Sequence, residues 1–218
     1  MPLTVSLSFE GLLRGVEVVA IVAMALSGLM EAARKDMDVV GVFASAFITA
    51  FGGGTVRDIL LDRRPLFWVQ YHEYVVLTFV LCLVAIPLLR RRHFPITEKA
   101  IRIPDALGLG LFTAAGVGPA LDAGLPLFIA ALMGVVTGVF GGVLRDVICN
   151  EIPIVFRDRR PYALLSFAGA WVFIVLHYAG APALATVATV VAVTAGLRLL
   201  ALARGWTVPG LPGAADPD

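Results

Sequence analysis

The sequence predicts an all-α membrane protein with seven transmembrane helices, arranged as a 3+3 inverted repeat plus a seventh helix. Three observations lead to this fold class: an apolar composition, seven apolar stretches, and one segment that occurs twice. Hydrophobic residues make up 59% of the 218 residues, charged residues make up 15%, and the mean hydropathy is +0.91. Soluble domains are about 45–50% apolar and about 25% charged, so much of this surface is expected to face hydrocarbon.

Seven apolar stretches have about the length that crosses a bilayer, which takes about 20 helical residues. They run over residues 12–33, 39–61, 74–89, 103–121, 125–149, 162–178 and 182–203, and the third and sixth are the shortest. Turn residues separate them in order: Arg34-Lys35-Asp36, Arg63-Arg64-Pro65, the basic stretch from Arg90 to Arg102, Asp122-Ala123-Gly124, Arg159-Arg160-Pro161 and Gly180-Ala181-Pro182. We expect a single transmembrane domain over residues 1–218, with a flexible tail at residues 205–218.

Basic residues give this domain an orientation, because Lys and Arg concentrate in cytoplasmic loops. Three basic residues belong to one side: Arg14, Arg63 and Arg64. Twelve belong to the other side: Arg34, Lys35, Arg90, Arg91, Arg92, Lys99, Arg102, Arg157, Arg159, Arg160, Arg198 and Arg204. The N-terminus is therefore expected outside and the C-terminus in the cytoplasm. No basic segment precedes the first apolar stretch, so we expect it to be retained and not cleaved as a signal peptide.

Two segments of the chain match when shifted by 88 positions. The first contains Thr49, Gly52-Gly53-Gly54, Arg57-Asp58 and Pro65, and the second contains Thr137, Gly141-Gly142, Arg145-Asp146 and Pro153. The same shift pairs Glu17 with Asp105. We infer a duplication, with repeat one over residues 11–89, repeat two over residues 103–178, and a seventh span at 182–203. Three spans in each copy force the second copy to enter the membrane in the opposite direction, an architecture common among transporters.

The glycines of the repeat admit two interpretations. Each glycine costs about 1 kcal/mol relative to alanine inside a helix, so Gly52 to Gly54 and Gly141-Gly142 are expected to bend or break spans two and five. A broken helix within the membrane leaves backbone groups without hydrogen bonds, so it is expected to line a water-filled path. The alternative is that the glycines allow close packing between helices. Thr49 and Thr137 beside them either line the path or bond to their own helix backbone.

Charged residues inside apolar spans are costly and commonly functional. Arg57-Asp58 and Arg145-Asp146 follow the glycines, and we expect each arginine to face a cavity or a carboxylate, or to extend its charged end to the membrane surface. Neighbouring helical residues point about 100° apart, so Arg57 and Asp58 need not pair with each other, and Glu17 or Asp105 of another span is an alternative partner. The alternative is a set of structural salt bridges between the repeats.

Other function classes find little support in the sequence. The formal net charge is +1, which indicates no nucleic-acid partner. Two cysteines and three histidines lack metal-ligand spacing, so no metal site is expected. No catalytic elbow, zinc-protease motif or nucleotide loop is present, so we expect no enzyme and no cofactor.

The paired Gly-Gly-Gly-x-x-Arg-Asp-like segments on spans two and five, in a 3+3+1 layout, resemble those of the trimeric intracellular cation (TRIC) channels and their bacterial relatives. The resemblance extends from about Gly11 to Arg204. It implies a homotrimer in the bacterial inner membrane, with lipid as a partner and a potassium or sodium pore in each protomer between the bent second and fifth helices. Phe140 replaces the first glycine in the second repeat. Span four has no Lys or Arg between Ile103 and Leu121, so the voltage response described for animal members is not expected.

Two functions follow from this sequence. A monovalent cation channel is the leading hypothesis, and a secondary transporter of a small solute such as glycine is the alternative. For the trimer, we expect helix faces rich in small residues, namely Gly108, Gly110, Ala114 and Ala115, to form the contacts.

Overall fold

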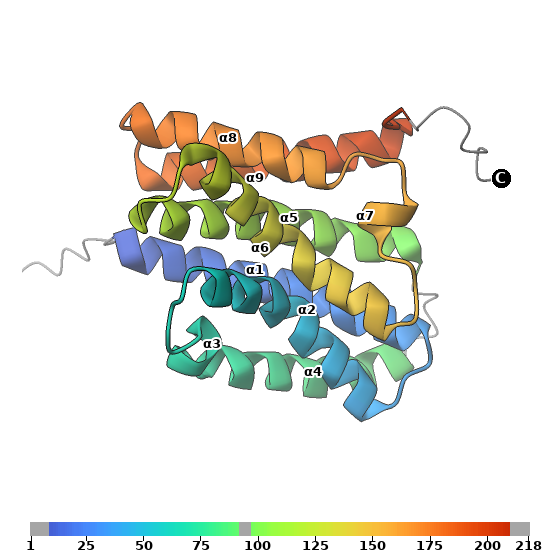
Figure 1. The fold of residues 1–218 in the computed structure, drawn as a ribbon. Coiled ribbons are helices and arrows are strands. Elements are labelled where there is room, and N and C mark those ends of the chain that lie inside the picture. The colour runs from blue at the N-terminus through green and yellow to red at the C-terminus, as the bar shows by residue number, and fades with distance from the viewer. Residues whose placement is uncertain (1–8, 92–96, 210–218) are drawn as a thin grey trace, which may run out of the picture.

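The computed structural model describes residues 9–91 and 97–209, and every regular element within these two ranges is a helix (Figure 1). Seven helices have 16 to 26 residues each: α1 (Phe9–Arg34), α2 (Val39–Leu60), α4 (Glu73–Arg91), α5 (Glu98–Asp122), α6 (Leu127–Ile148), α8 (Ala163–Tyr178) and α9 (Ala183–Arg204). Two four-residue helices follow α2 and α6: α3 (Phe67–Gln70) and α7 (Ile154–Arg157). Arg92 and most of the expected tail, residues 210–218, lie outside the described residues.

The long helices lie where the apolar stretches predict them, with one clear difference at the start of α5. This helix begins at Glu98 rather than near Ile103, because Thr97 caps it by accepting a hydrogen bond from the N–H of Ala100 at 3.3 Å. The charged first turn has low hydropathy, so a search for apolar stretches excludes it. The short helices α3 and α7 were not predicted at all.

Composition and exposure identify an all-helical membrane protein. Five helices, α1, α2, α5, α6 and α9, are long and apolar enough to cross a membrane, and the apolar parts of α4 and α8 are shorter. Large apolar side chains are exposed along one face of α4, including Val76, Phe79, Val80 and Leu83. A contiguous apolar surface of this kind is unfavourable in water and favourable against lipid.

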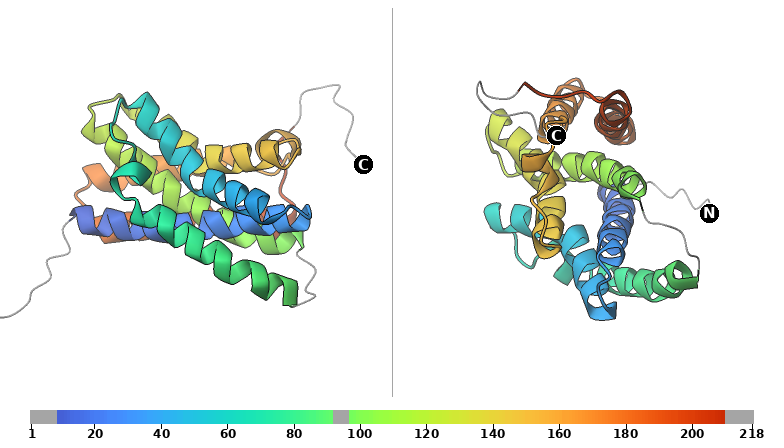
Figure 2. Two further views of the ribbon diagram at one scale, coloured as in Figure 1. Left: turned by 90° about the horizontal axis from the view of Figure 1, so that it is seen from below. Right: turned by 90° about the vertical axis from the view of Figure 1, so that its right-hand side faces the viewer.

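The helices form two groups joined at the centre of the molecule. α1 packs against α2 and α4, whereas α5 packs against α6, α8 and α9. The groups meet where α1 contacts α5 and α2 contacts α6, and the end-on view shows α4 and the α8–α9 pair on opposite sides (Figure 2). Successive long helices run in alternating directions, so the described chain begins at one end of the molecule and finishes at the other (Figure 1).

The turns around α2 and α6 match at a spacing of 88 residues. Both helices begin and end at equivalent positions, Val39 and Leu127, then Leu60 and Ile148. The residues with positive φ also match: Asp36 with Gly124, and Asp62 with Asn150. The similarity expected from the sequence therefore extends to the backbone conformation of both turns.

The small residues that we expected to form trimer contacts are instead buried within this chain. A Cβ at Gly108 would lie 2.4 Å from the Met24 sulfur, and one at Gly110 would lie 3.1 Å from the Val191 Cα. Ala114 and Ala115 are 0% and 3% exposed. This prediction was wrong because α5 is a central helix, and its small residues permit close packing against α1 and α9.

Candidate functional site

The glycines of the repeat lie where α2 and α6 cross. A Cβ at Gly53 would lie 2.1 Å from the carbonyl oxygen of Thr137, and one at Gly141 would lie 2.3 Å from the carbonyl oxygen of Thr49. Contacts this short leave room for a hydrogen atom only. The sequence predicts a bend or a break here, and a break is absent because both helices continue through the glycines without interruption. The glycines allow the two backbones to touch, which is the packing alternative.

The two threonines beside the crossing bond to their own helices. Thr49 donates its hydroxyl to the Ser45 carbonyl at 2.6 Å, and Thr137 donates to the Met133 carbonyl at 2.7 Å. Each hydroxyl lies over a glycine of a neighbouring helix: a Cβ at Gly28 would be 2.4 Å from Thr49 Oγ1, and one at Gly116 would be 2.5 Å from Thr137 Oγ1. The α1–α2 and α5–α6 contacts are therefore close for the same reason as the crossing.

The remaining glycines of the repeat accept side chains from other segments. A Cβ at Gly52 would lie 2.6 Å from Leu144 Cδ1, and one at Gly54 would lie 2.4 Å from the Phe67 ring. A Cβ at Gly142 would lie 3.3 Å from the Tyr162 hydroxyl. Gly54 thus holds the start of α3 against α2, and Gly142 faces a polar group.

Arg57 is buried near the end of α2 that adjoins α3. Its Nε and Nη2 lie 2.9 and 2.8 Å from Oδ1 of Asp58, and its Nη1 donates to the Ala115 carbonyl at 3.2 Å. Nη1 also lies 3.6 Å from Oε1 of Glu17. The second oxygen of Asp58 accepts the backbone N–H of Phe67 at 2.7 Å. Asp58 therefore neutralises the arginine and holds the first turn of α3.

Arg145 repeats this arrangement at the end of α6. Its Nε and Nη2 lie 2.9 and 2.8 Å from Oδ1 of Asp146, and Oδ2 of Asp146 accepts the N–H of Ile154, the first residue of α7, at 2.8 Å. Nη1 donates to Oγ of Ser27 at 2.6 Å and to Oδ1 of Asp105 at 2.7 Å. Glu17 and Asp105, the partners that the sequence offers from other spans, do pair with the arginines, and the adjacent aspartates pair with them as well.

The Arg145 cluster includes two side chains that the sequence did not single out. Tyr162 is buried, and its hydroxyl and Oδ1 of Asp105 both face the Cα of Gly142. The guanidinium carbon of Arg198 lies 4.8 Å from the centre of the Tyr162 ring, and Nη1 donates to the Pro161 carbonyl at 3.0 Å. Arg198 had been assigned to the cytoplasmic end from its position, but it is a buried residue of α9. A basic residue within an apolar stretch was the available signal.

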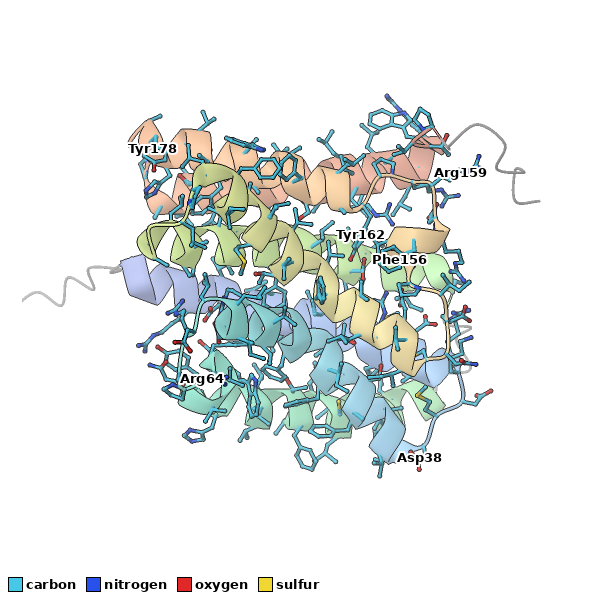
Figure 3. All side chains as sticks on the ribbon, viewed as in Figure 1. Asp38, Arg64, Phe156, Arg159, Tyr162 and Tyr178 are labelled. Carbon is cyan, nitrogen blue, oxygen red and sulfur yellow. The ribbon has the colours of Figure 1, made fainter. Side chains whose placement is uncertain are left out.

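The two ends of the molecule differ in the space beside these clusters. Figure 3 shows Arg64 and Tyr178 at one end, here called the α3 end, and Asp38, Phe156 and Arg159 at the other, the α7 end. A cavity of about 460 Å³ opens at the α3 end, and its lining residues include Arg14, Glu17, Arg57, Asp58, Arg63, Tyr71 and Asp122. The cavity at the α7 end has only about 20 Å³ and is lined by residues that include Glu31, Arg34, Ile101, Arg102, Arg145, Glu151 and Arg157.

Charged side chains of both signs line the cavities at the two ends. The larger cavity carries three arginines and three carboxylates, so both signs of charge are available to a small polar solute or an ion. Within the described residues, no group of three or more His, Cys, Asp or Glu side chains could hold a metal ion. Between the two cavities lies the α2–α6 crossing, where only backbone separates the two helices.

Comparisons with known proteins agree on one family. A family model described as glycine transporter matches residues 15–90 and 102–178. The UPF0126 inner membrane protein YadS of Escherichia coli is 36% identical over 188 residues, which cover 85% of this chain and 89% of YadS. A UPF0126 membrane protein of Deinococcus radiodurans is 32% identical over 163 residues, covering 74% of each chain.

Solved structures of similar fold are TRIC cation channels. The TRIC trimeric intracellular cation channel orthologue from Rhodobacter sphaeroides has a TM-score of 0.82 and 31% identity, covering 89% of this chain and 99% of that one. A second structure, determined to explain conductance through TRIC cation channels, has a TM-score of 0.80 and 30% identity, covering 93% of this chain and 98% of that one. The similarity therefore extends over nearly the whole chain.

The close α2–α6 crossing predicts that even a Gly→Ala substitution there lowers the free energy of unfolding. Gly53→Ala or Gly141→Ala should lower the free energy of unfolding by about 1–3 kcal/mol, because the added methyl group displaces a carbonyl of the facing helix. The matched control is Gly196→Ala in α9, where a Cβ meets no atom within 4 Å. That variant should be unchanged or more stable, because alanine favours helix by up to about 1 kcal/mol. Thermal unfolding in detergent measures the difference, and equal effects at all three positions would contradict the close crossing.

The charged clusters predict unequal effects at equivalent positions. Asp105→Asn should lower the free energy of unfolding by about 3 kcal/mol, because the buried guanidinium of Arg145 loses a carboxylate at 2.7 Å. Glu17→Gln should cost about 1 kcal/mol or less, because Glu17 lies 3.6 Å from Arg57 and borders the open cavity. Chemical unfolding of both variants in the same detergent makes the comparison. A larger effect at Glu17 would reverse this ranking.

Proposed function

The chain is a bacterial member of the TRIC family, matched by the glycine transporter family model, and on this basis we propose that it is a channel for monovalent cations such as potassium and sodium. The observation that carries the proposal is the similarity to TRIC cation channels at TM-scores of 0.80 and 0.82 over 93% and 89% of the chain. The whole fold is shared, and not only an isolated hairpin or helix pair.

The pore of this proposal runs within one protomer between α2 and α6. The cavity at the α3 end reaches Glu17, Arg57 and Asp58, and the equivalent charges at the α7 end are Asp105, Arg145 and Asp146. The crossing between them is the closed constriction, formed by Gly52, Gly53, Gly54, Gly141 and Gly142 with the carbonyls of Thr49 and Thr137. Separation of the two helices would line the gap with backbone oxygens, which replace the hydration shell of alkali cations.

We further propose that all seven long helices cross the membrane. Helices α1, α2 and α4 form the first repeat, α5, α6 and α8 form the second in inverted orientation, and α9 is the seventh span. The repeats cover residues 11–89 and 103–178, and the seventh span covers 182–203. The alternating helix directions and the 88-residue match of the turns support this arrangement (Figure 1).

The proposed assembly is a homotrimer in the inner membrane, with lipid around it. The similar protein from Rhodobacter sphaeroides is described as a trimeric channel, and YadS is described as an inner membrane protein. Because the small residues of α5 are buried within the protomer, the trimer contacts fall to exposed apolar faces, such as that of α4.

A secondary transporter of a small solute such as glycine is the second candidate function. Two observations favour it: the family model is described as glycine transporter, and the cavity at the α3 end, about 460 Å³, is much larger than the cavity of about 20 Å³ at the α7 end. A carrier alternates between a state that is open to one side of the membrane and a state that is open to the other. The three arginines and three carboxylates that line the larger cavity match the opposite charges of a zwitterion.

Electrical recording separates the two functions. Purified protein in planar bilayers should give discrete unitary currents in potassium or sodium chloride, because a channel opens a continuous path for ions. Protein-free bilayers and bilayers with heat-denatured protein serve as controls. Saturable uptake of labelled glycine into proteoliposomes, without unitary currents, would instead identify a carrier.

The proposed orientation has its own test. A reporter fused after Arg204 should be active only in a form that folds in the cytoplasm, because basic residues cluster in the loops at that end. Tyr178, the last residue of α8, lies at the α3 end of the molecule (Figure 3). A fusion after Tyr178 should therefore be active only with a reporter that works outside the cytoplasm. Activity of the external reporter after Arg204 would invert the topology.

A further inference from the structure

The two ends of the molecule have the same backbone in the turns that meet there. Lys35 follows α1 and its N–H donates to the Glu31 carbonyl at 3.1 Å, while Ala123 follows α5 and donates to the Pro119 carbonyl at 3.1 Å. After α6, the N–H of Glu151 donates to the Asp146 carbonyl at 2.8 Å. After α2, the N–H of Arg63 donates to the Asp58 carbonyl, also at 2.8 Å. Each end thus serves as an internal control for the other.

Among the described residues, an ion pair joins these turns at the α7 end and not at the α3 end. Nζ of Lys35 donates to Oε1 of Glu151, and Oε2 of Glu151 lies 3.0 Å from Nη1 of Arg157. The hydrogen bond from Lys35 lowers the pKa of Glu151, so this carboxylate is ionised at neutral pH. At the α3 end the equivalent residues are Ala123 and Arg63, which cannot form such a pair. The contact therefore joins the α1–α2 turn to the α6–α7 loop at one end alone.

The residues that line the two cavities also correspond. Arg14, Arg57, Arg63, Pro119 and Asp122 at the α3 end are equivalent, at a shift of 88 positions, to Arg102, Arg145, Glu151, Glu31 and Arg34 at the α7 end. Equivalent surfaces thus enclose about 460 Å³ at one end and about 20 Å³ at the other. The turns follow the same course at both ends, whereas the side chains that they carry differ.

We propose that the ion pair between Lys35 and Glu151 is a latch, and that it closes a second cavity at the α7 end equivalent to the open cavity at the α3 end. The proposal deepens the proposed function, because both cavities belong to one path between α2 and α6. Release of the latch separates the α1–α2 turn from the α6–α7 loop and exposes the buried wall of the second cavity.

The strength of the pair suits a latch. The side chains of Lys35 and Glu151 are 31% and 26% exposed, so water screens their attraction. Partly exposed ion pairs of this kind shift an equilibrium roughly two- to five-fold. Such a contact favours the closed state of the α7 end in the equilibrium between closed and open, and it still allows opening.

Cysteine labelling tests the latch without reference to ion flow. Ile101 lines the closed cavity and is 4% exposed, whereas Pro119 lines the open one. With the native cysteines replaced (Cys82→Ala, Cys149→Ala), we expect a polar maleimide to label Pro119→Cys quickly and Ile101→Cys slowly in the purified full-length protein. Lys35→Met or Glu151→Gln should accelerate labelling at Ile101→Cys roughly two- to five-fold and leave Pro119→Cys unchanged.

The double variant and a transplanted pair complete the experiment. Glu151→Gln removes the pair with Lys35 together with the contact to Arg157, so Lys35→Met with Glu151→Gln should label no faster than Glu151→Gln alone. Ala123→Lys with Arg63→Glu recreates the pair at the α3 end and should slow labelling of Pro119→Cys.

Several results would overturn the latch. It fails if the labelling rate of Ile101→Cys does not change when the pair is broken. It also fails if the rate increases from the two substitutions multiply in the double variant. Faster labelling at both Ile101→Cys and Pro119→Cys would indicate general loosening of the protein and not release of a latch. Channel currents do not enter these measurements, so a failure of the latch is distinguishable from a failure of the channel proposal.

Discussion

The contact between α2 and α6 at Gly53 and Gly141 is the constraint on which the rest of this structure depends. Each glycine faces a carbonyl oxygen of the opposite helix at a distance that admits no side chain. The other long helices pack mainly within their own groups, so this crossing and the α1–α5 contact hold the two groups together. Helix association in a membrane relies on such packing, because lipid removes the hydrophobic force between helices. The distance between the two charged clusters follows from this contact.

The charged clusters show how the chain tolerates two arginines at the ends of apolar helices. Asp58 and Asp146 each pair with the preceding arginine through one oxygen and hold the first N–H of a short helix through the other. A single carboxylate thus neutralises a buried cation and directs the chain after the membrane helix. Glu17 and Asp105 supply the second negative charge from the central helices. The residues that form these ion pairs are the ones that line the path in the proposed channel, so the two interpretations do not exclude each other.

The difference between the two ends arises from side chains on a shared backbone. Turns with matching hydrogen bonds and matching positive φ values carry Lys35 and Glu151 at one end, and Ala123 and Arg63 at the other. In the proposed inverted repeat, equivalent residues line both cavities, and the cavities have volumes of about 20 and 460 Å³. The seventh helix adds a further difference, because Arg198 and Tyr162 extend only the Arg145 cluster.

The sequence by itself determined the long helices and the 88-residue match, and it offered Glu17 and Asp105 as partners of the arginines. These features depend on composition, on the order of residues along the chain and on the cost of an unpaired charge, and all three can be read from the amino-acid sequence. The tertiary structure alone decided that the glycines form a crossing rather than a break, since a glycine in a sequence does not show whether another backbone approaches it. It also decided that Gly108 and Gly110 face neighbours within the chain, that Asp58 holds the N–H of Phe67, and that Arg198 lies over Tyr162. Each of these contacts depends on which groups of different segments meet in space, and the hydropathy of the sequence does not predict that.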